Sequence, residues 1–259
     1  MRAAYCPGVE TLRYGTHPDQ VVDLTFPGTA AHPPLVVLLH GGFWRVAYDR
    51  THLAAVADAL TAEGVAVANV EYRRVGGGGG WPATFSDVGE AVEAVQVALA
   101  DRVDLGSVAY VGHSAGGHLA LWSASRPGLP AGAPGAGPLV APRLVVSLAG
   151  VCDLHAGAAG GIGEGAVAEF LGASPDQAPE RYRLASPLAR LPLGVAQLLV
   201  HGDADPRVPV EQSRAHAAAA AAAGDPVELV ELPGVDHLAV IDPASPAWAE
   251  VTRRLGRFT

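Results

Sequence analysis

The sequence contains no lysine, so its 17 basic residues are all arginines, and they face 26 acidic residues in a chain of 259. The net charge of −9 and the lack of a basic cluster make nucleic acid and anionic membranes poor candidates for partners. No run approaches the roughly 20 apolar residues of a membrane-spanning helix. The first residues also lack the apolar run of a signal peptide, which favours a cytoplasmic protein.

Cysteine is scarce as well, with only Cys6 and Cys152. These two could pair, but they form neither a disulfide framework nor a zinc-binding pattern. Histidines and acidic residues do not show the helical spacing of a metal site, so we expect no metal and no cofactor. The five consecutive glycines, Gly76–Gly80, lack the following Lys-Ser/Thr of a phosphate-binding loop, and we expect a mobile loop that cannot pack.

What the chain has in quantity is apolar sequence: 49% of its residues are hydrophobic and 17% are charged, which indicates a globular protein. Residues 35–39 form a continuous apolar run, typical of a strand buried on both faces of a parallel sheet. Residues 49–62 have helical periodicity instead. After two short edge strands at 9–15 and 20–26, strands and helices alternate along the whole chain. We therefore predict an α/β fold with a mostly parallel central sheet and helices on both faces.

The length suits a single domain, 1–259, with one longer interruption. Residues 153–192 separate two predicted strands and are expected to form a small cap-like insertion with one short helix at 164–171. Thr84 or Ser86 is expected to cap the helix that follows the glycine run.

The segment Gly112-His113-Ser114-Ala115-Gly116 has the pattern of a nucleophile elbow. An apolar run, 108–111, enters it and a helix-compatible run, 117–125, leaves it. In such an elbow a serine lies on a sharp turn between a strand and a helix. The turn needs neighbours without a Cβ atom because other backbone passes close by. Ser114 is therefore the predicted nucleophile.

A serine hydroxyl is a weak nucleophile and needs a base, which in turn needs an orienting carboxylate. The carboxyl ends of parallel strands meet at one edge of a sheet. Asp203 and Asp205 follow the strand at 196–200, and His237 follows the last strand. Either aspartate could orient His237. The chain order Ser, Asp, His is that of α/β-hydrolases.

Acyl transfer also requires backbone amides aimed at the developing oxyanion. The segment His40-Gly41-Gly42-Phe43-Trp44 follows the strand at 35–39. We expect the amides of Gly42, Phe43 and Ala115 to form the oxyanion hole. Trp44 and His113 are candidates for the substrate pocket, with simple packing as the alternative for Trp44.

Several other polar residues are expected to be structural. His40 and His201, at strand ends, should hold loops by hydrogen bonds, and Asp236, which precedes His237, should be structural. Tyr72, Arg73 and Asp87 should belong to a buried polar network.

Nearly the whole chain, from about residue 20 to 257, resembles the α/β-hydrolase superfamily, and within it the kynurenine formamidases (arylformamidases) and the hormone-sensitive-lipase-like esterases. The resemblance rests on residues 40–44, 71–73, 112–118, 186–187, 205–209 and 236–237. Phe43 stands where those esterases carry a third glycine, whereas the formamidases have an aromatic residue there followed by Trp.

The resemblance favours Asp205 as the acid and leaves Asp203 a turn residue. It implies a serine hydrolase of small carboxylic esters or amides, with an aryl formamide such as N-formylkynurenine as the leading substrate. A short-chain carboxylesterase is the alternative, and a non-catalytic binding protein on the same fold is a third possibility. The partner is then a small-molecule ester or amide, with a homodimer left open.

Overall fold

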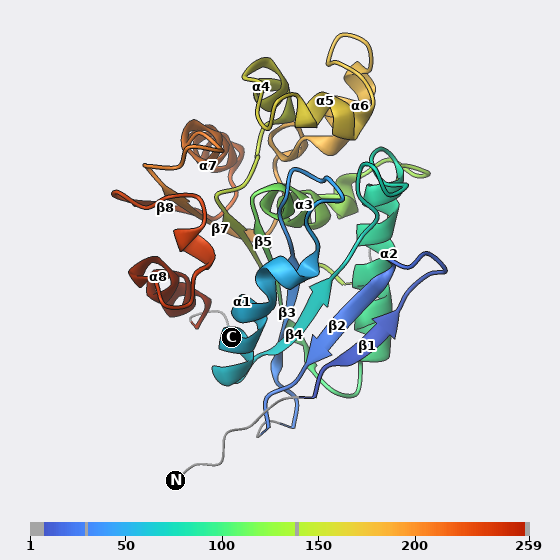
Figure 1. The fold of residues 1–259 in the computed structure, drawn as a ribbon, viewed down its shortest axis with the longest axis vertical. Helices are drawn as coiled ribbons and strands as arrows, with labels where there is room; N and C mark the ends of the chain where they lie inside the picture. Colours follow the sequence, from blue (N-terminus) through green and yellow to red (C-terminus); the bar gives the residue numbers. More distant parts are fainter. Residues whose placement is uncertain (1–7, 29–30, 138–139, 257–259) are drawn as a thin grey trace.

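The computed structural model describes residues 8–28, 31–137 and 140–256, and the strands of these residues form one eight-stranded sheet (Figure 1). Cys6 lies outside the described residues. The strands in chain order are β1 (Glu10–Arg13), β2 (Val21–Thr25), β3 (Pro34–Leu39), β4 (Ala66–Val70), β5 (Asp104–His113), β6 (Leu144–Leu148), β7 (Ala196–Gly202) and β8 (Val227–Leu232).

The strand order across the sheet is β1-β2-β4-β3-β5-β6-β7-β8. The pairs β1–β2 and β2–β4 are antiparallel, and every other neighbouring pair is parallel. The predicted mostly parallel sheet, with two antiparallel strands at one edge, is thus confirmed. The carboxyl ends of β3, β5, β6, β7 and β8 consequently meet at one edge, where the candidate residues follow.

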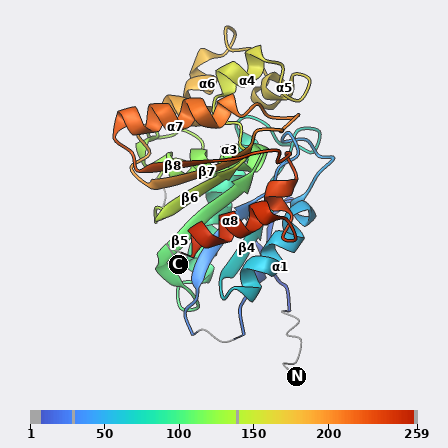
Figure 2. The ribbon, with the colours of Figure 1, turned by 90° about the vertical axis from the view of Figure 1, so that its left-hand side faces the viewer.

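Helices cover both faces of the sheet, as Figures 1 and 2 show. The α-helices are α1 (Ala54–Ala62), α2 (Ala83–Ala98), α3 (Ala115–Ala124), α4 (Leu154–Ala159), α5 (Ala166–Leu171), α6 (Pro179–Ala185), α7 (Glu211–Ala223) and α8 (Pro246–Leu255), and the 3₁₀ turns are η1 (Arg50–Leu53), η2 (Arg126–Gly128), η3 (Pro187–Arg190) and η4 (Ala239–Ile241). Helices α1 and α8 pack on one face, and α2, α3 and α7 pack on the other. No helix of the described residues is long and apolar enough to cross a membrane.

The sheet separates two halves of the hydrophobic core. In β3, Leu35, Val37 and Leu39 point into the half under α2 and α3, while Val36 and Leu38 point into the half under α1 and α8. Burying each such side chain stabilises the fold by about 1.5–3 kcal/mol. The apolar run at 35–39 is therefore a strand buried on both faces, and it forms a rigid base for the loop that follows it.

The predicted cap of α2 is wrong. The helix begins at Ala83, so Thr84 and Ser86 lie inside it. The Thr84 hydroxyl instead accepts a hydrogen bond from the Gly80 amide at 2.9 Å and donates one to the Arg73 carbonyl at 2.6 Å. A threonine hydroxyl suits several backbone partners near a helix start, and the sequence does not show which one it selects.

The glycine run before α2 is also packed, contrary to expectation. The amides of Gly77 and Gly79 both donate to the Arg74 carbonyl, at 2.8 and 2.9 Å. A Cβ on Gly79 would lie 2.1 Å from the Arg73 carbonyl oxygen, and Gly80 is buried. The missing side chains let the backbone fold closely onto itself, so the run forms a hydrogen-bonded turn.

The segment between β6 and β7 contains three short helices, α4, α5 and α6, where the sequence predicted one. They lie beyond the carboxyl edge of the sheet (Figure 1). Asp153 caps α4 by accepting the amides of His155 and Ala156, and α5 is bounded by left-handed glycines at 165 and 172. Helices of six or seven residues show less than two turns of periodicity, so local caps rather than apolar pattern mark them.

Candidate active site

Ser114 lies on a strained turn between β5 and α3. Its backbone has a positive φ, with φ 57° and ψ −120°, a combination that residues with a side chain rarely adopt, and its side chain is buried. A Cβ on Gly112 would lie 2.0 Å from the Gly116 carbonyl oxygen, and one on Gly116 would lie 2.0 Å from the carbonyl oxygen of Leu39. Both positions therefore require glycine, and the segment has the strand–turn–helix geometry that the pattern predicts.

His237 and Asp205 are brought together from two different loops, after β8 and β7. The Nδ1 atom of His237 lies 2.6 Å from Oδ2 of Asp205. The other carboxylate oxygen accepts the amides of Arg207, at 2.8 Å, and Val208, at 2.9 Å. His201 Nε2 lies 3.3 Å from Oδ2. The carboxylate is thus held from four sides.

Burial disfavours the charged form of Asp205, but the hydrogen bonds from His201, His237 and the Val208 amide outweigh it, so the pKa of Asp205 lies below its ordinary value. The carboxylate is therefore ionised at neutral pH. An ionised acceptor at Nδ1 holds a hydrogen on that atom and leaves Nε2 of His237 to accept a proton.

Asp203, the competing acid, has a different partner. Its Oδ1 accepts the Gly234 amide at 2.6 Å and ties the turn after β8 to the end of β7. Asp236 likewise accepts the amides of Leu238 and Ala239, both at 2.9 Å. These two aspartates shape the loop that carries His237, whereas Asp205 contacts its ring.

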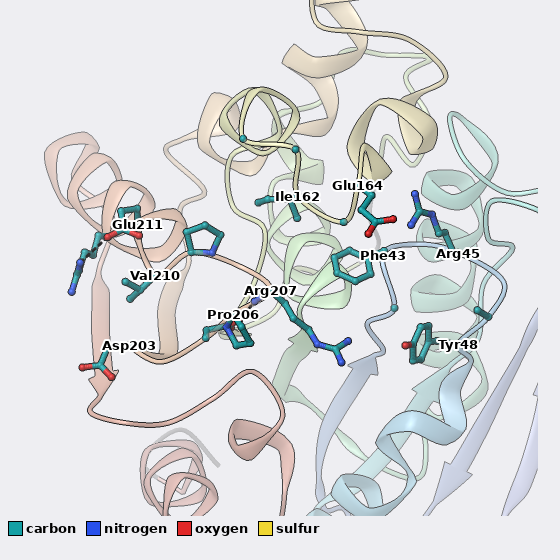
Figure 3. A pocket seen from close by; sticks show the side chains of 18 residues that line it. Phe43, Arg45, Tyr48, Ile162, Glu164, Asp203, Pro206, Arg207, Val210 and Glu211 are labelled. Atoms are coloured by element: carbon teal, nitrogen blue, oxygen red, sulfur yellow. Dashed lines mark hydrogen bonds and ion pairs between the residues drawn. The ribbon is translucent and has the colours of Figure 1, made fainter.

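Ser114 and His237 line one small cavity of about 260 Å³. The other residues around it are Gly42, Phe43, Tyr48, His52, His113, Arg207 and Leu238. No hydrogen bond joins the Ser114 hydroxyl to the His237 ring among the contacts of the described residues. The cavity shares Gly42, Phe43, Tyr48 and Arg207 with a wider cleft of about 980 Å³ that extends to the loop before α5 (Figure 3).

The turn after β3 passes directly beside Ser114. A Cβ on Gly41 would lie 3.0 Å from the Ser114 Cβ, and Gly42, Phe43 and Trp44 all have left-handed backbone, with φ 108°, 55° and 56°. Within the described parts of the chain, the amides of Gly42, Phe43 and Ala115 donate to no protein acceptor. Three N–H groups close to Ser114 are therefore free to bind a ligand oxygen.

Trp44 does not line either cavity. Its ring is fully buried and stacks on Phe170 of α5, with centroids 4.5 Å apart and an interplanar angle of 7°. Its Nε1 donates to Nδ1 of His118 in α3 at 3.2 Å. The left-handed backbone turns this ring into the core, so Trp44 packs the turn against α5 and α3 and is not a wall of the pocket.

His113 lines the small cavity and also holds the His237 loop. Its Nε2–H donates to the His237 carbonyl at 2.8 Å, and its Nδ1 lies 3.4 Å from Nε2 of His52. Burial first, and then the neighbouring His237 ring, lower the pKa of His113 well below its usual value. His113 is therefore neutral, with a bare Nδ1 that can accept from His52.

A buried network supports the base of the turn after β3. His40 Nε2 lies 3.0 Å from the Glu71 carboxylate, and the Tyr72 hydroxyl donates to the His40 carbonyl at 2.7 Å. Burial opposes the charge of Glu71, but the hydrogen bond and charge of His40 lead the contacts that lower its pKa. Arg73 and Asp87 form a separate pair, with contacts of 2.8 and 2.6 Å. His40 thus holds a loop, as expected from the sequence.

Four residues at the small cavity were not singled out from the sequence: Tyr48, His52, Arg207 and Leu238. Arg207 lies two residues after the predicted acid, Leu238 directly follows the predicted base, and this closeness in sequence is a usable signal. Tyr48 and His52 carry no comparable pattern, because their position at the cavity depends on the path of the loop that follows the turn after β3.

Known structures with the same fold cover nearly the whole chain. A truncated carbohydrate esterase from gut microbiota has a TM-score of 0.81 at 21% identity, over 98% of this chain and 96% of that one. Esterase B from Lactobacillus rhamnosis has a TM-score of 0.83 at 22% identity, over 97% and 84%. A thermophilic esterase from the planctomycete Thermogutta terrifontis, with propionate bound, has a TM-score of 0.78 at 23% identity, over 97% and 93%. These matches show the α/β-hydrolase fold.

No curated protein matches the chain in sequence. The BD-FAE family model does match, over residues 22–219, which include the turn after β3, the elbow and Asp205 and end before His237. Because this match spans most of the sequence, the chain belongs to the BD-FAE family.

Proposed function

We propose that this protein is a serine hydrolase of small carboxylic esters, with Ser114 as nucleophile, His237 as base and Asp205 as the acid that orients the base. The observation that carries the proposal is the 2.6 Å hydrogen bond between His237 and Asp205 at the cavity that Ser114 also lines. A nucleophile, a base and an orienting carboxylate are the three groups that this chemistry needs.

In the proposed reaction, the Ser114 oxygen bonds to the ester carbonyl carbon while Nε2 of His237 takes the serine proton. The bond to the leaving alkoxide then breaks, and His237 returns the proton to it as an alcohol. Water, deprotonated by the same histidine, attacks the acyl-enzyme, releases the carboxylic acid and restores the serine. Asp205 remains ionised throughout and stabilises the imidazolium.

We assign to the amides of Gly42, Phe43 and Ala115 the stabilisation of the negative charge that develops on the carbonyl oxygen. These N–H groups have no protein acceptor among the described residues, so they enter the reaction without breaking another hydrogen bond. Donors fixed in place before the reaction require no reorganisation, and losing one typically costs about 2.7–4 kcal/mol of transition-state stabilisation.

Small esters are favoured over aryl formamides as substrates. The similar structures are esterases by name, and one of them holds propionate. The cavity at Ser114, about 260 Å³, is of a size for a short acyl chain. Hydrolysis of N-formylkynurenine stays a prediction from the resemblance alone, because the aromatic wall expected from Trp44 is turned into the core.

The test is kcat/KM for p-nitrophenyl acetate with the wild-type chain, the Ser114→Ala variant and the Ser174→Ala variant. Ser174 is a half-buried residue between α5 and α6 whose hydroxyl donates to Gln177 at 3.1 Å, which makes it a matched control. We expect kcat/KM to fall at least about 10³-fold in Ser114→Ala and to match the wild-type value in Ser174→Ala. A phosphonate ester should label Ser114 by mass spectrometry. Undiminished turnover by Ser114→Ala would overturn the proposal.

Parallel measurement of N-formylkynurenine separates the two substrate classes. A higher kcat/KM for the acetate supports the esterase, and a clear preference for the formamide would make the chain an arylformamidase instead.

A further inference from the structure

Arg207 is a cation without a partner at the wall of the site. It lines both the small cavity with Ser114 and the wider cleft. Its amide donates to Asp205 at 2.8 Å, so the start of its side chain is fixed to the carboxylate that holds His237. Its guanidinium makes no hydrogen bond or ion pair with any residue that the structure describes.

The other arginines around the cleft are already neutralised. Arg45 contacts Glu169 at 2.7 Å, and Arg214 contacts Glu211 at 3.0 Å and Glu231 at 2.5 Å. Arg207 therefore differs from both in having its charge available to a ligand.

One acidic residue of the cleft wall, Glu164, also has no partner among the described contacts. In Figure 3 it lies on the far wall, on the side of Arg45, whereas the Arg207 side chain extends toward Phe43 and Tyr48. Arg207 and Glu164 thus belong to different parts of the cleft, and of the two only Arg207 also lines the small cavity with Ser114.

The surface around Arg207 is largely apolar. Phe43, Tyr48 and Leu238 line the small cavity with it, and Tyr48 and Leu238 remain 41% and 44% exposed. A ligand that fits this wall has an apolar body and one anionic group. Guanidinium is suited to such a group because it binds a carboxylate through two parallel N–H donors.

The charge of the whole chain gives this arginine a second role. A net charge of −9 repels anionic substrates, and the cation of Arg207 at the cavity that Ser114 lines offsets that repulsion where the ester must bind.

We propose that Arg207 binds a carboxylate of the substrate, so that the preferred substrates are short esters with a carboxylate near the scissile bond. This inference rests on the proposed esterase function. The carboxylate can belong to the acyl part or to the alcohol part of the ester, and the chemistry at Arg207 is the same in both.

The experiment compares two pairs of esters that differ in charge. The pair 3-acetoxybenzoate and phenyl acetate carries the carboxylate on the leaving group, and the pair monoethyl succinate and ethyl pentanoate carries it on the acyl group. For each pair, the measured quantity is the ratio of kcat/KM for the anionic ester to kcat/KM for the neutral one. It is determined for the wild type and for Arg207→Gln, Arg207→Lys and Arg214→Gln.

We expect Arg207→Gln to lower the ratio about tenfold for at least one pair, since a charge-assisted hydrogen bond at an exposed site is lost. Arg207→Lys should retain part of the wild-type preference for the anionic ester, because lysine keeps the charge but lacks the two parallel N–H donors of the guanidinium. Arg214→Gln removes a positive charge from the same cleft and should leave the ratio unchanged, since that arginine is already paired. The wild-type ratio should also fall with added salt.

The pair that responds identifies the part of the ester that bears the carboxylate. If Arg207→Gln changes neither ratio while turnover still depends on Ser114, the inference about Arg207 is overturned and the esterase function stands. If the wild type hydrolyses p-nitrophenyl acetate but none of the four esters, the inference about Arg207 alone is overturned. If it hydrolyses none of the five, the esterase function fails and the inference fails with it.

Discussion

The imidazole of His113 donates a hydrogen bond of 2.8 Å to the backbone carbonyl of His237. The residue before the proposed nucleophile therefore holds the residue proposed as its base. The rings of the two histidines lie 4.6 Å apart, so His113 fixes His237 both through the main chain and by ring contact.

Removing this donor should loosen the proposed base. In His113→Leu the His237 carbonyl keeps no partner, which costs about 1–3 kcal/mol, and a displaced base lowers kcat by about tenfold with a smaller change in KM. His113→Gln, which retains an N–H donor, should recover part of kcat. Steady-state kinetics with p-nitrophenyl acetate measures both effects. Equal losses in the two variants would contradict the role given to this hydrogen bond.

Two aspartates two residues apart allow a matched test of the acid. Asp205→Asn should lower kcat by about 10³–10⁴-fold at neutral pH, because an amide cannot hold the required tautomer or stabilise the imidazolium. Asp203→Asn keeps an oxygen acceptor for the Gly234 amide and should remain within a few fold of wild type. Measurement of kcat at pH 7 for the two variants shows which aspartate is the acid. A larger loss in Asp203→Asn would reverse the assignment.

Much of this site could be predicted because its parts follow strand ends. Ser114 directly follows β5, and Asp205 and His237 lie three and five residues beyond the ends of β7 and β8. The rule that parallel strands end at one edge places these loops together. The elbow adds a local requirement, since Gly112 and Gly116 each face a carbonyl oxygen 2.0 Å from where a Cβ would be. The local sequence is therefore sufficient to predict the sharp turn at Ser114.

Side-chain direction within loops could not be predicted. Trp44 lies in the turn after β3, where the sequence suggested a wall of the pocket. Three successive residues with positive φ, of which Trp44 is the last, instead direct its ring onto Phe170. Tyr48 and His52, which follow this turn in the chain, line the small cavity because the turn directs the backbone after it past Ser114. Whether the guanidinium of Arg207 forms an ion pair depends on which carboxylates lie nearby in space, and no local sequence pattern shows that.

A methyl group at Gly116 should disrupt the elbow. In Gly116→Ala the new Cβ would lie 2.0 Å from the Leu39 carbonyl oxygen and 2.6 Å from that of His40, so the β3 or α3 backbone must move. We expect the free energy of unfolding to fall by more than about 3 kcal/mol and the Tm to fall by roughly 6–12 °C, with loss of esterase activity. Gly256→Ala is the control, because a Cβ on Gly256 would lie 3.4 Å from the Thr252 carbonyl oxygen, an ordinary contact, and the φ of Gly256 is −63°. Thermal unfolding should leave that variant within about 0.5 kcal/mol of wild type, and equal Tm values for both would contradict the packing argument.

Histidine burial predicts how stability depends on pH. His216, in α7, lies away from the proposed site and contacts Gln197 at 2.8 Å. Burial lowers its pKa to about 4, partly opposed by the charge of Asp225. The unfolded chain therefore binds a proton on this residue below pH 6.5, whereas the folded chain does not until about pH 4.

The stabilisation from neutral His216 is thus complete above pH 6.5 and is lost as the pH falls toward 4, at about 1.4 kcal/mol per pH unit. His216→Gln removes this titration, so the free energy of unfolding of the variant should decline less steeply between these pH values. Urea unfolding at half-unit pH steps measures the two slopes. His118, whose pKa burial also lowers to about 4, is unchanged in the variant and keeps its own contribution to the slope. Identical slopes for wild type and variant would mean that His216 is not held neutral by the fold.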